Sequence, residues 1–449
     1  MDLDGDVTKR LEAYLGDIGE ILKYPKRKAA FATYVVGLFS MVERKTAEGL
    51  AALSVPDPNR ADAEHQRLLH VIGQSRWSDR NVRRHAAKYA LDSIASTGKV
   101  ESWIIDDTGW LKKGNHSVGV QRQYTGTSGK VDNCQLGVTL AAATRDWQLP
   151  LDFELYLPET WIEDEARRLE AKIPTDRRFK TKEELALEMI DRAVADNLPR
   201  PKIALADSFY GRSCGFRAAV RAHQIHYGVG VRRDIKVRRI DSKGTLRGPV
   251  TTASAIAKKV QFRRVKWTDG SDGDLSSHFA FVRVVPQADL KADPSAESVW
   301  LVIERAHDDE PCKYLLCSMP KTTPRRELVR LLHQRWRIER VYQDMKQEFG
   351  LDQYQGRSFV GWHHHVSAAM VGYAFAVAEQ ARLFPPGALS LAETRPTFVR
   401  PAATPFRRVD GHHSARDTAA NSTLVTALSV LPTTDAETGR VRLRSNVTQ

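Results

Sequence analysis

The first part of the chain carries apolar residues at spacings of three and four, which is the pattern of helices that bury one face. This periodicity predicts helices over residues 7–24, 28–41, 61–73 and 78–96. Pro56-Asp57-Pro58-Asn59 breaks the pattern, and Ser78-Asp79 has the composition of a helix N-cap. We therefore expect an all-α N-terminal domain over residues 1–98.

From residue 99 onward, short apolar runs replace the helical periodicity, as is typical of buried strands. Amphipathic stretches separate the later runs, so that strands and helices alternate. The pattern predicts strands over residues 102–107, 116–124, 133–143, 149–157, 203–207 and 226–231, and helices over 182–197, 213–223 and 325–349. The expected class is α/β, with the core domain in two parts, 99–231 and 321–384.

Residues 232–320 interrupt this alternation with strand-like runs at 260–267, 278–285, 298–305 and 314–318, which we interpret as a β-rich insertion. A last helix is expected over 361–384. Its residues His363-His364-His365 point in different helical directions, which makes a shared metal site an unfavourable interpretation. Residues 385–449 are rich in Pro, Thr, Ala and Arg without periodicity, which predicts a flexible tail.

Charge changes this picture because it is concentrated in one segment. The 449 residues carry a formal net charge of +13. Residues 231–267 alone hold twelve basic and two acidic side chains, which gives 12 − 2 = +10. Such a segment favours a polyanionic partner.

Several classes of protein are disfavoured by what the sequence lacks. It has no apolar run of 18 or more residues, its N-terminus is acidic, and its four cysteines are scattered. A membrane span, a signal peptide and a structural zinc site are therefore not expected. We expect a cytoplasmic, nucleoid-associated protein of two to four domains.

Candidate chemistry lies at acidic positions. Asp106-Asp107 and Asp207 each end an apolar run, at the strand edge where α/β sheets usually place functional groups. Glu339 lies on the 325–349 helix, where a ~60° arc, at about 100° per residue, also holds Arg335 and Lys346. A carboxylate flanked by cations suits a metal ion and a phosphate chain together.

Three converging carboxylates would raise one another's pKa values, so such a site requires cations. Two Mg²⁺ (or Mn²⁺) ions roughly 3.5–4 Å apart can serve both oxygens of a phosphodiester displacement, and Mg²⁺ prefers oxygen ligands. Adjacent strand residues face opposite ways, so only one of Asp106 and Asp107 can face such ions. The residues alone favour Asp107 and leave Asp106 open.

The helix motif resembles that of bacterial insertion-sequence transposases of the DDE type, in the cut-and-paste group with a Tyr-x2-Arg-x3-Glu-x6-Lys signature. Arg335, Glu339 and Lys346 match the last three members, whereas Leu332 occupies the tyrosine position. The resemblance covers roughly residues 99–382. It implies an RNase H-like catalytic core, which the order of strands and helices also fits.

The aspartates extend the resemblance, because Asp107-Thr108 resembles the first-aspartate motif and Ala206-Asp207-Ser208 the second. The resemblance therefore implies that Asp107, Asp207 and Glu339 are the catalytic metal ligands of a DNA transposase, supported by Arg335 and Lys346. Such an enzyme binds the terminal inverted repeats of an insertion sequence, cleaves the ends and joins them to target DNA. Its partners would be double-stranded DNA, at the transposon ends and at the target, and a second copy of the chain in a synaptic homodimer.

The sequence also suggests where DNA binds, and the all-α N-terminal domain at 1–98 is expected to bind the transposon ends. Candidates in the basic insertion and after the first acid are Arg232, Arg233, Arg238, Arg239 and Lys112. Tyr314 lies where relatives place an aromatic residue that stacks on a flipped base, although some relatives have tryptophan there. Two alternatives remain at this point: a non-catalytic DNA-binding regulator derived from a transposase, and an RNase H-like host nuclease.

Overall fold

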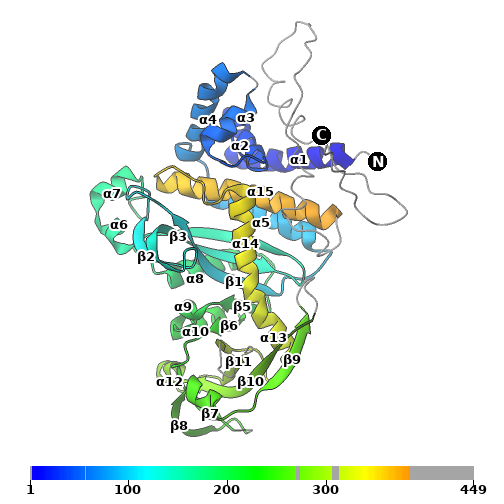
Figure 1. Ribbon diagram of the computed structural model, residues 1–449, viewed down its shortest axis with the longest axis vertical. Helices are drawn as coiled ribbons and strands as arrows, with labels where there is room; N and C mark the ends of the chain where they lie inside the picture. Colours follow the sequence, from blue (N-terminus) through cyan, green and yellow to red (C-terminus); the bar gives the residue numbers. More distant parts are fainter. Residues whose placement is uncertain (1–2, 56, 242, 269–273, 306–312, 384–449) are drawn as a thin grey trace, which may run out of the picture. The chain divides into compact units, whose positions relative to one another are not determined.

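The computed structural model describes residues 3–55, 57–241, 243–268, 274–305 and 313–383 (Figure 1). Its contacts divide the chain into two compact units. The sheet unit is Ile94–Tyr342, and the helical unit combines Met1–Ser93 with Gln343–Gln449. The tail expected at 385–449 lies outside the described residues.

The sheet unit begins with a mixed sheet in which β1, β5 and β6 run parallel and β3 runs antiparallel to β1. Its strands are β1 (Ser102–Leu111), β2 (Gln121–Thr125), β3 (Lys130–Ala143), β4 (Gln148–Tyr156), β5 (Ile203–Ala206) and β6 (His226–Gly230). The spatial order β4-β3-β1-β5-β6, with β2 also paired to β3, is consistent with the expected RNase H-like core.

The strands expected as an insertion continue this same sheet, which Figure 1 shows as one ladder from β1 to β7. The four expected strands are β9 (Arg263–Thr268), β10 (Asp274–Pro286), β11 (Val299–Arg305) and β12 (Lys313–Cys317), and the structure adds β7 (Lys236–Ile240) and β8 (Leu246–Thr252), which were not predicted. β12 pairs antiparallel with β6, so the sheet reaches twelve strands. This pairing covers the edge of β6, which would otherwise present unpaired backbone groups.

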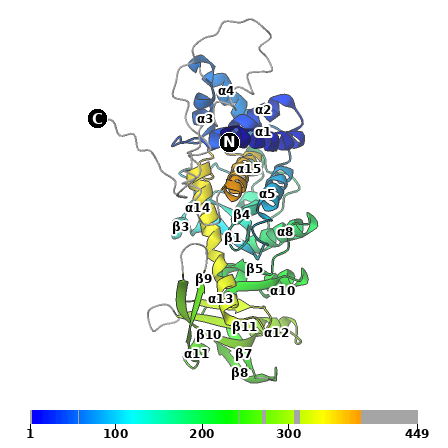
Figure 2. The ribbon, with the colours of Figure 1, turned by 90° about the vertical axis from the view of Figure 1, so that its right-hand side faces the viewer.

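Helices cover both faces of the sheet. Figure 2 shows α8 (Lys182–Ala195) and α10 (Cys214–Ala222) on one face and α13 (Arg325–His333) on the other. The sheet unit also contains α6 (Glu159–Glu163), α7 (Glu165–Glu170), α9 (Ser208–Gly211), α11 (Ala253–Ala257) and α12 (Gln287–Ala292).

Three predicted elements differ clearly from the structure. Of the strand predicted over 116–124, only residues 121–124 lie in β2. The helix predicted over 325–349 is divided into α13, the 3-10 turn η2 (Gln334–Trp336) and α14 (Arg337–Phe349). The strand predicted to end at Asp107 continues to Leu111, because β3 is long enough to pair with β1 along its whole length. The acids of β1 therefore lie in mid-strand.

The helical unit confirms the four helices predicted near the N-terminus and adds one that the periodicity did not reveal. It contains α1 (Leu3–Leu22), α2 (Pro25–Leu38), α3 (Ala47–Ser54), η1 (Pro58–Arg60), α4 (Ala61–Gly73), α5 (Asp79–Ile94) and α15 (Phe359–Leu383). α15 is buried on all sides for most of its length, as expected of a helix that is apolar all round. The sequence-based division grouped α15 with the catalytic core, whereas the structure places it in the helical unit, where its contacts include α1, α2 and α4.

Polar residues inside the helical unit have specific partners. Glu379 is fully buried and accepts hydrogen bonds from Arg10 and Arg382. Arg83, also buried, bonds Asp79 and Ser367, so it belongs to the core of this unit.

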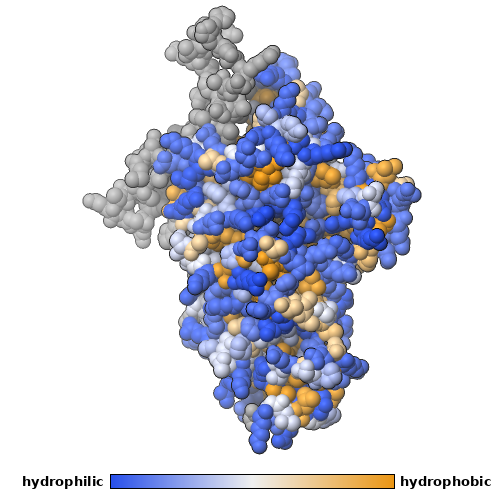
Figure 3. Space-filling view, turned by 180° about the vertical axis from the view of Figure 1, so that it is seen from behind, coloured by the Kyte–Doolittle hydropathy of each residue, from blue (hydrophilic) through white to orange (hydrophobic). Residues whose placement is uncertain are grey.

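The three consecutive histidines have separate contacts, as their helical directions predict. Ring nitrogens of His363, His364 and His365 lie 3.0, 2.9 and 3.0 Å from the carbonyl oxygens of Phe359, Ile72 and Gly350. Among the described residues, no helix is both long and apolar enough to cross a membrane. Figure 3 shows mostly hydrophilic residues on the visible face, with hydrophobic patches scattered between them.

Candidate catalytic site

The site begins where β5 ends beside β1. The last parallel pair joins Ile105 to Ala206, so Asp106 and Asp207 are the next residues on neighbouring strands. Asp207 stops the strand because its Oδ1 accepts hydrogen bonds from the backbone amides of Phe209 and Tyr210, at 2.9 and 3.4 Å. It thereby caps α9, as aspartate commonly does.

A glycine allows this turn to lie against β6. A Cβ placed on Gly211 would fall 1.9 Å from the carbonyl oxygen of Gly230, so a side chain at residue 211 would displace the turn. The close approach fixes α9, and with it Asp207, against the sheet.

Asp106 lies on the face that carries Glu339. One guanidinium joins the two acids: Arg335 Nη1 lies 3.0 Å from Asp106 Oδ2, and Arg335 Nη2 lies 3.1 Å from Glu339 Oε1. The Asp106 side chain is 17% exposed and that of Glu339 64%. The structure therefore brings Arg335, Glu339 and Asp106 together.

Asp107 has a different partner. Its Oδ2 lies 2.8 Å from Nζ of Lys182, the first residue of α8, and both side chains are mostly buried. Because β1 alternates its side chains between two faces, Asp107 points toward the α8 side and Asp106 toward the α13 side. Sequence reasoning did not identify Lys182.

A buried polar network holds the turn that carries Arg335. Gln334 is fully buried, donates to Glu101 at 2.8 Å and accepts from the Ser102 hydroxyl at 2.8 Å. Arg330 binds the same Glu101 carboxylate through both Nη atoms, at 2.7 and 2.8 Å. These contacts tie η2 and α13 to the start of β1. The position of Arg335 relative to Asp106 is therefore set by its neighbours.

The acids are short of positive charge. Burial raises the pKa of Asp106 to about 7, with Asp107 and Asp207 adding to the effect and Arg335 opposing it. Burial also raises the pKa of Asp207, against the hydrogen bonds that it accepts from Phe209 and Tyr210. A carboxylate that is costly to ionise in this way is stabilised by any further cation brought close to it.

The donor chemistry fits a hard divalent cation, because Asp106, Asp107, Asp207 and Glu339 offer carboxylate oxygens. Among the described residues, however, no three His, Cys, Asp or Glu side chains are already gathered at metal-binding distances. Beside the aspartates, Tyr210 is fully buried, and its hydroxyl has no hydrogen-bond partner among the described residues. This buried polar atom is a second sign that the site is built for additional polar groups.

The two other signature positions, Leu332 and Lys346, have surroundings of their own. Leu332 takes the tyrosine position and packs in the core, where a Cβ on Gly228 would come 2.5 Å from its Cδ2. Lys346 lies on the part of α14 that belongs to the helical unit, and burial lowers its pKa while Asp352 opposes the shift.

The predicted DNA-binding residues differ in exposure. Arg232, Arg233 and Arg239 are exposed, whereas Arg238 is half-buried. Both acids of the basic segment are paired within it, Asp234 to Arg232 at 3.1 Å and Asp241 to Arg247 at 3.0 Å. Most of the segment's positive charge therefore has no acid beside it within the segment.

Two further candidates lie on or next to strands. Tyr314 is half-buried on β12 opposite Ile303, and Lys112 is half-buried directly after β1. In contrast, Trp300 packs against Phe281 and Arg283.

Comparison with known proteins agrees with this geometry. Residues 19–274 match the protein family described as "DDE superfamily endonuclease", and residues 180–374 match "Transposase DDE domain". A curated relative from Microchaete diplosiphon, named "Probable transposase for insertion sequence element IS701", is 30% identical over 204 residues. The match covers 45% of this chain and 48% of the relative, so the chain spans about half the length of that protein.

Proposed function

Since the chain belongs to the DDE superfamily of endonucleases, we propose that it is an insertion-sequence transposase. It would bind the terminal inverted repeats of its element, cleave the DNA ends and join them to target DNA, as a synaptic homodimer at the bacterial nucleoid. The observation that carries the proposal is the single guanidinium of Arg335 between Asp106 and Glu339, with Asp207 adjacent on the next strand. A regulator would not require this arrangement of acids.

Enzymes of this superfamily generally depend on divalent metal ions. We propose Mg²⁺ or Mn²⁺ here, held by Asp207, Glu339 and one aspartate of β1. When bound, such ions stabilise the charge that develops on the phosphodiester and lower the pKa of the attacking water. The protein's own part is to orient the carboxylates, which the Asp207 cap and the Gln334 network do.

The sequence motif and the ion pairs point to different aspartates of β1 as the metal ligand. The motif favours Asp107, whereas the shared contact with Arg335 favours Asp106 as the residue that faces Glu339. We therefore propose Asp106 as the metal-facing acid and Asp107 as the partner of Lys182. Lys182 would then act as a positioning residue that holds the neighbouring backbone of β1 in place.

Cleavage assays with gel-shift controls test the proposal. Asp207→Asn and Glu339→Gln should each abolish cleavage while end binding persists, because affinity comes mainly from phosphate contacts and the acids act on the transition state. Asp106→Asn should be equally inactive, and Asp107→Asn should retain measurable cleavage. An inactive Asp107→Asn beside an active Asp106→Asn would return the assignment to Asp107. Full activity in all four variants would refute a DDE mechanism.

DNA binding is proposed for two further regions. The basic segment at 232–266 and the N-terminal helices are candidates for contacts with the duplex, by phosphate neutralisation and helix insertion respectively. The first is supported by its exposed, largely unmatched cations.

A further inference from the structure

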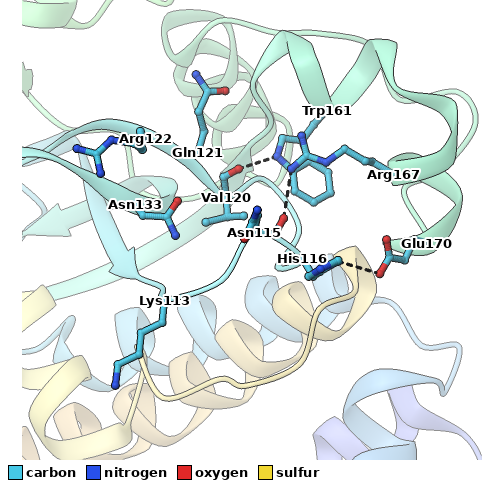
Figure 4. Close-up of a pocket in the computed structure, with 10 residues that line it drawn as sticks. All are labelled: Lys113, Asn115, His116, Val120, Gln121, Arg122, Asn133, Trp161, Arg167 and Glu170. Atoms are coloured by element: carbon cyan, nitrogen blue, oxygen red, sulfur yellow. Dashed lines mark hydrogen bonds and ion pairs between the residues drawn. The ribbon is translucent and has the colours of Figure 1, made fainter.

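A hollow of about 770 Å³ opens beside the loop that follows β1. It is bounded by this loop, by β2 and β3, and by α6 and α7. Figure 4 shows Lys113 and Arg122 on one side of it, and Trp161, Arg167 and the His116–Glu170 pair on the other. None of these residues belongs to the cluster of acids.

The loop is held at three points by side chains from other elements. Asn133 Nδ2 donates to the carbonyl oxygens of Lys112 and Gly114, at 2.7 and 3.0 Å. Trp161 Nε1 donates to Val120 O at 2.9 Å, and Arg167 Nη2 donates to Asn115 O at 3.3 Å. A loop held in this way keeps its cations in place before a ligand arrives, which lowers the entropic cost of binding.

The lining is basic. The residues that line it include Lys113, His116, Arg122 and Arg167 but one acid, Glu170, whose carboxylate lies 3.4 Å from Nδ1 of His116. The Arg167 guanidinium is stacked on the Trp161 ring, with its Cζ 3.7 Å from the ring centroid. The stacking fixes the plane of the guanidinium, which keeps its Nη2 in place to hold the carbonyl oxygen of Asn115.

The hollow and the acids lie at different points along β1, because the loop that lines the hollow follows the end of this strand. β1 continues from Asp107 to Leu111, a distance of about 13 Å at roughly 3.3 Å per residue. Duplex DNA advances about 3.4 Å per base pair, so this distance corresponds to about four base pairs. A duplex aligned along β1 with one phosphodiester at the acids would bring another to the hollow.

We propose that this hollow is a binding subsite for a backbone phosphate of duplex DNA, about four base pairs or more from the bond that is cut. The proposal rests on the proposed function, since it takes the substrate to be DNA. It assigns to Lys113 and Arg122 the direct contact with phosphate. Arg167 and Asn133 position the loop.

The test uses a fluorescent 40-base-pair duplex of arbitrary sequence and the full chain. Lys113→Ala combined with Arg122→Ala removes two exposed cations, neither of which has a side-chain partner described in the structure. Each phosphate contact contributes about −0.9 to the slope of log K against log salt. Removing two contacts should therefore make the slope shallower by about 1.8. Between 50 and 200 mM salt, the factor by which the variant loses affinity should be about 10-fold smaller than the factor for the unaltered chain.

Two controls make the result specific. Arg200→Ala combined with Lys291→Ala removes the same charge from exposed positions outside the hollow and should keep the unaltered slope. The double variant Lys113→Arg with Arg122→Lys keeps both positive charges, so it should have the salt slope of the unaltered chain. The subsite would be overturned if the Lys113→Ala/Arg122→Ala variant had the same salt slope as the unaltered chain. It would also be overturned if the Arg200→Ala/Lys291→Ala control changed the slope by the same amount as that variant. A subsite that failed while the unaltered chain still cleaved DNA would leave the proposed function standing.

A second measurement localises the contact. Gln121 is exposed and lines the hollow without adding charge, so Gln121→Cys can carry a photoactivated crosslinker. We expect labelled Gln121→Cys to give several-fold more crosslinks to the duplex than either control. The controls are labelled Lys291→Cys and the unaltered chain labelled at its native cysteines. Yields at the level of these two controls would show that DNA does not reach the hollow, and would overturn the proposal.

Discussion

Asp106→Asn should stabilise the protein while removing its activity. The pKa of Asp106 is raised from an ordinary value of 3.8 to about 7, so the folded state binds this proton more tightly than the unfolded state does. Stability is consequently lost as the pH rises from about 4 to about 7. At about 1.4 kcal/mol per pKa unit, the ionised carboxylate costs up to about 4 kcal/mol above pH 7. Asparagine has a similar shape and avoids this cost, and Arg335 keeps its contact with Glu339.

Asp107→Asn is the matched comparison and should have the opposite sign. It breaks the 2.8 Å ion pair with Lys182 and leaves a mostly buried ammonium without its counter-ion. We expect a loss on the order of 2 kcal/mol.

Thermal unfolding in EDTA measures both variants without bound metal. At pH 8 the Asp106→Asn protein should melt above the unaltered chain and the Asp107→Asn protein below it. The gain in Asp106→Asn should shrink as the pH is lowered toward 4, because the unfolded state then begins to take up the proton that the folded state already holds. If Asp106→Asn melts below the unaltered chain at pH 8, or if its gain does not depend on pH, the inferred shortage of positive charge around Asp106 is wrong.

Three further predictions concern the metal, the basic segment and the helical unit. Cleavage should require Mg²⁺ or Mn²⁺, and Ca²⁺ should support DNA binding without cutting because it accepts the same oxygens with looser geometry; efficient cutting in excess EDTA would contradict this. Alanine replacement of four arginines should weaken binding to specific and random duplex alike and flatten the salt slope by up to a few units, as gel shifts over a salt series would measure. These arginines are Arg232, Arg233, Arg238 and Arg239. Burial lowers the pKa of His364 to about 4 from 6.5, so stability should fall by up to about 3 kcal/mol between pH 6.5 and 4, and urea unfolding of His364→Gln should show a weaker acid effect.

The order of elements in the sheet unit could be read from the sequence because each element has its own local pattern. The strand at 203–207 and the helix at 182–197 are found within two residues of the predicted bounds. What the pattern did not provide was the partner of each strand. Nothing local to β12 indicates that it pairs with β6, which is far away in the chain, so the continuation of one sheet through the expected insertion was not predicted. The length of β1 is likewise set by β3 and not by its own residues.

The acids of the candidate site were proposed from local features: the aspartates end apolar runs, and Glu339 shares a helix face with Arg335. The counter-ion of Asp107 has no such local mark. Lys182 opens an amphipathic helix and has an ordinary capping context, and its contact with Asp107 joins residues 75 positions apart. Gln334 also lacks a local feature that would mark it, although it is fully buried and bonds Glu101. The mid-strand place of the two aspartates follows from non-local pairing as well.

The sheet unit carries two groups of charge with opposite effects on DNA: the acids of the site repel it, and the exposed cations attract it. Four carboxylates lie in or beside the site, and among the residues that the structure describes the cations paired to them are Arg335 and Lys182, so by itself the cluster repels a phosphodiester. The exposed cations of the basic segment and of the hollow near Lys113 attract one. DNA affinity and catalysis should consequently respond to different substitutions: removing a cation outside the site weakens binding, whereas neutralising Asp106 or Asp207 removes cleavage and reduces the repulsion. Asp207→Asn should therefore bind the duplex in EDTA at least as tightly as the unaltered chain, and weaker binding by this variant would mean that Asp207 positions DNA instead of acting on it.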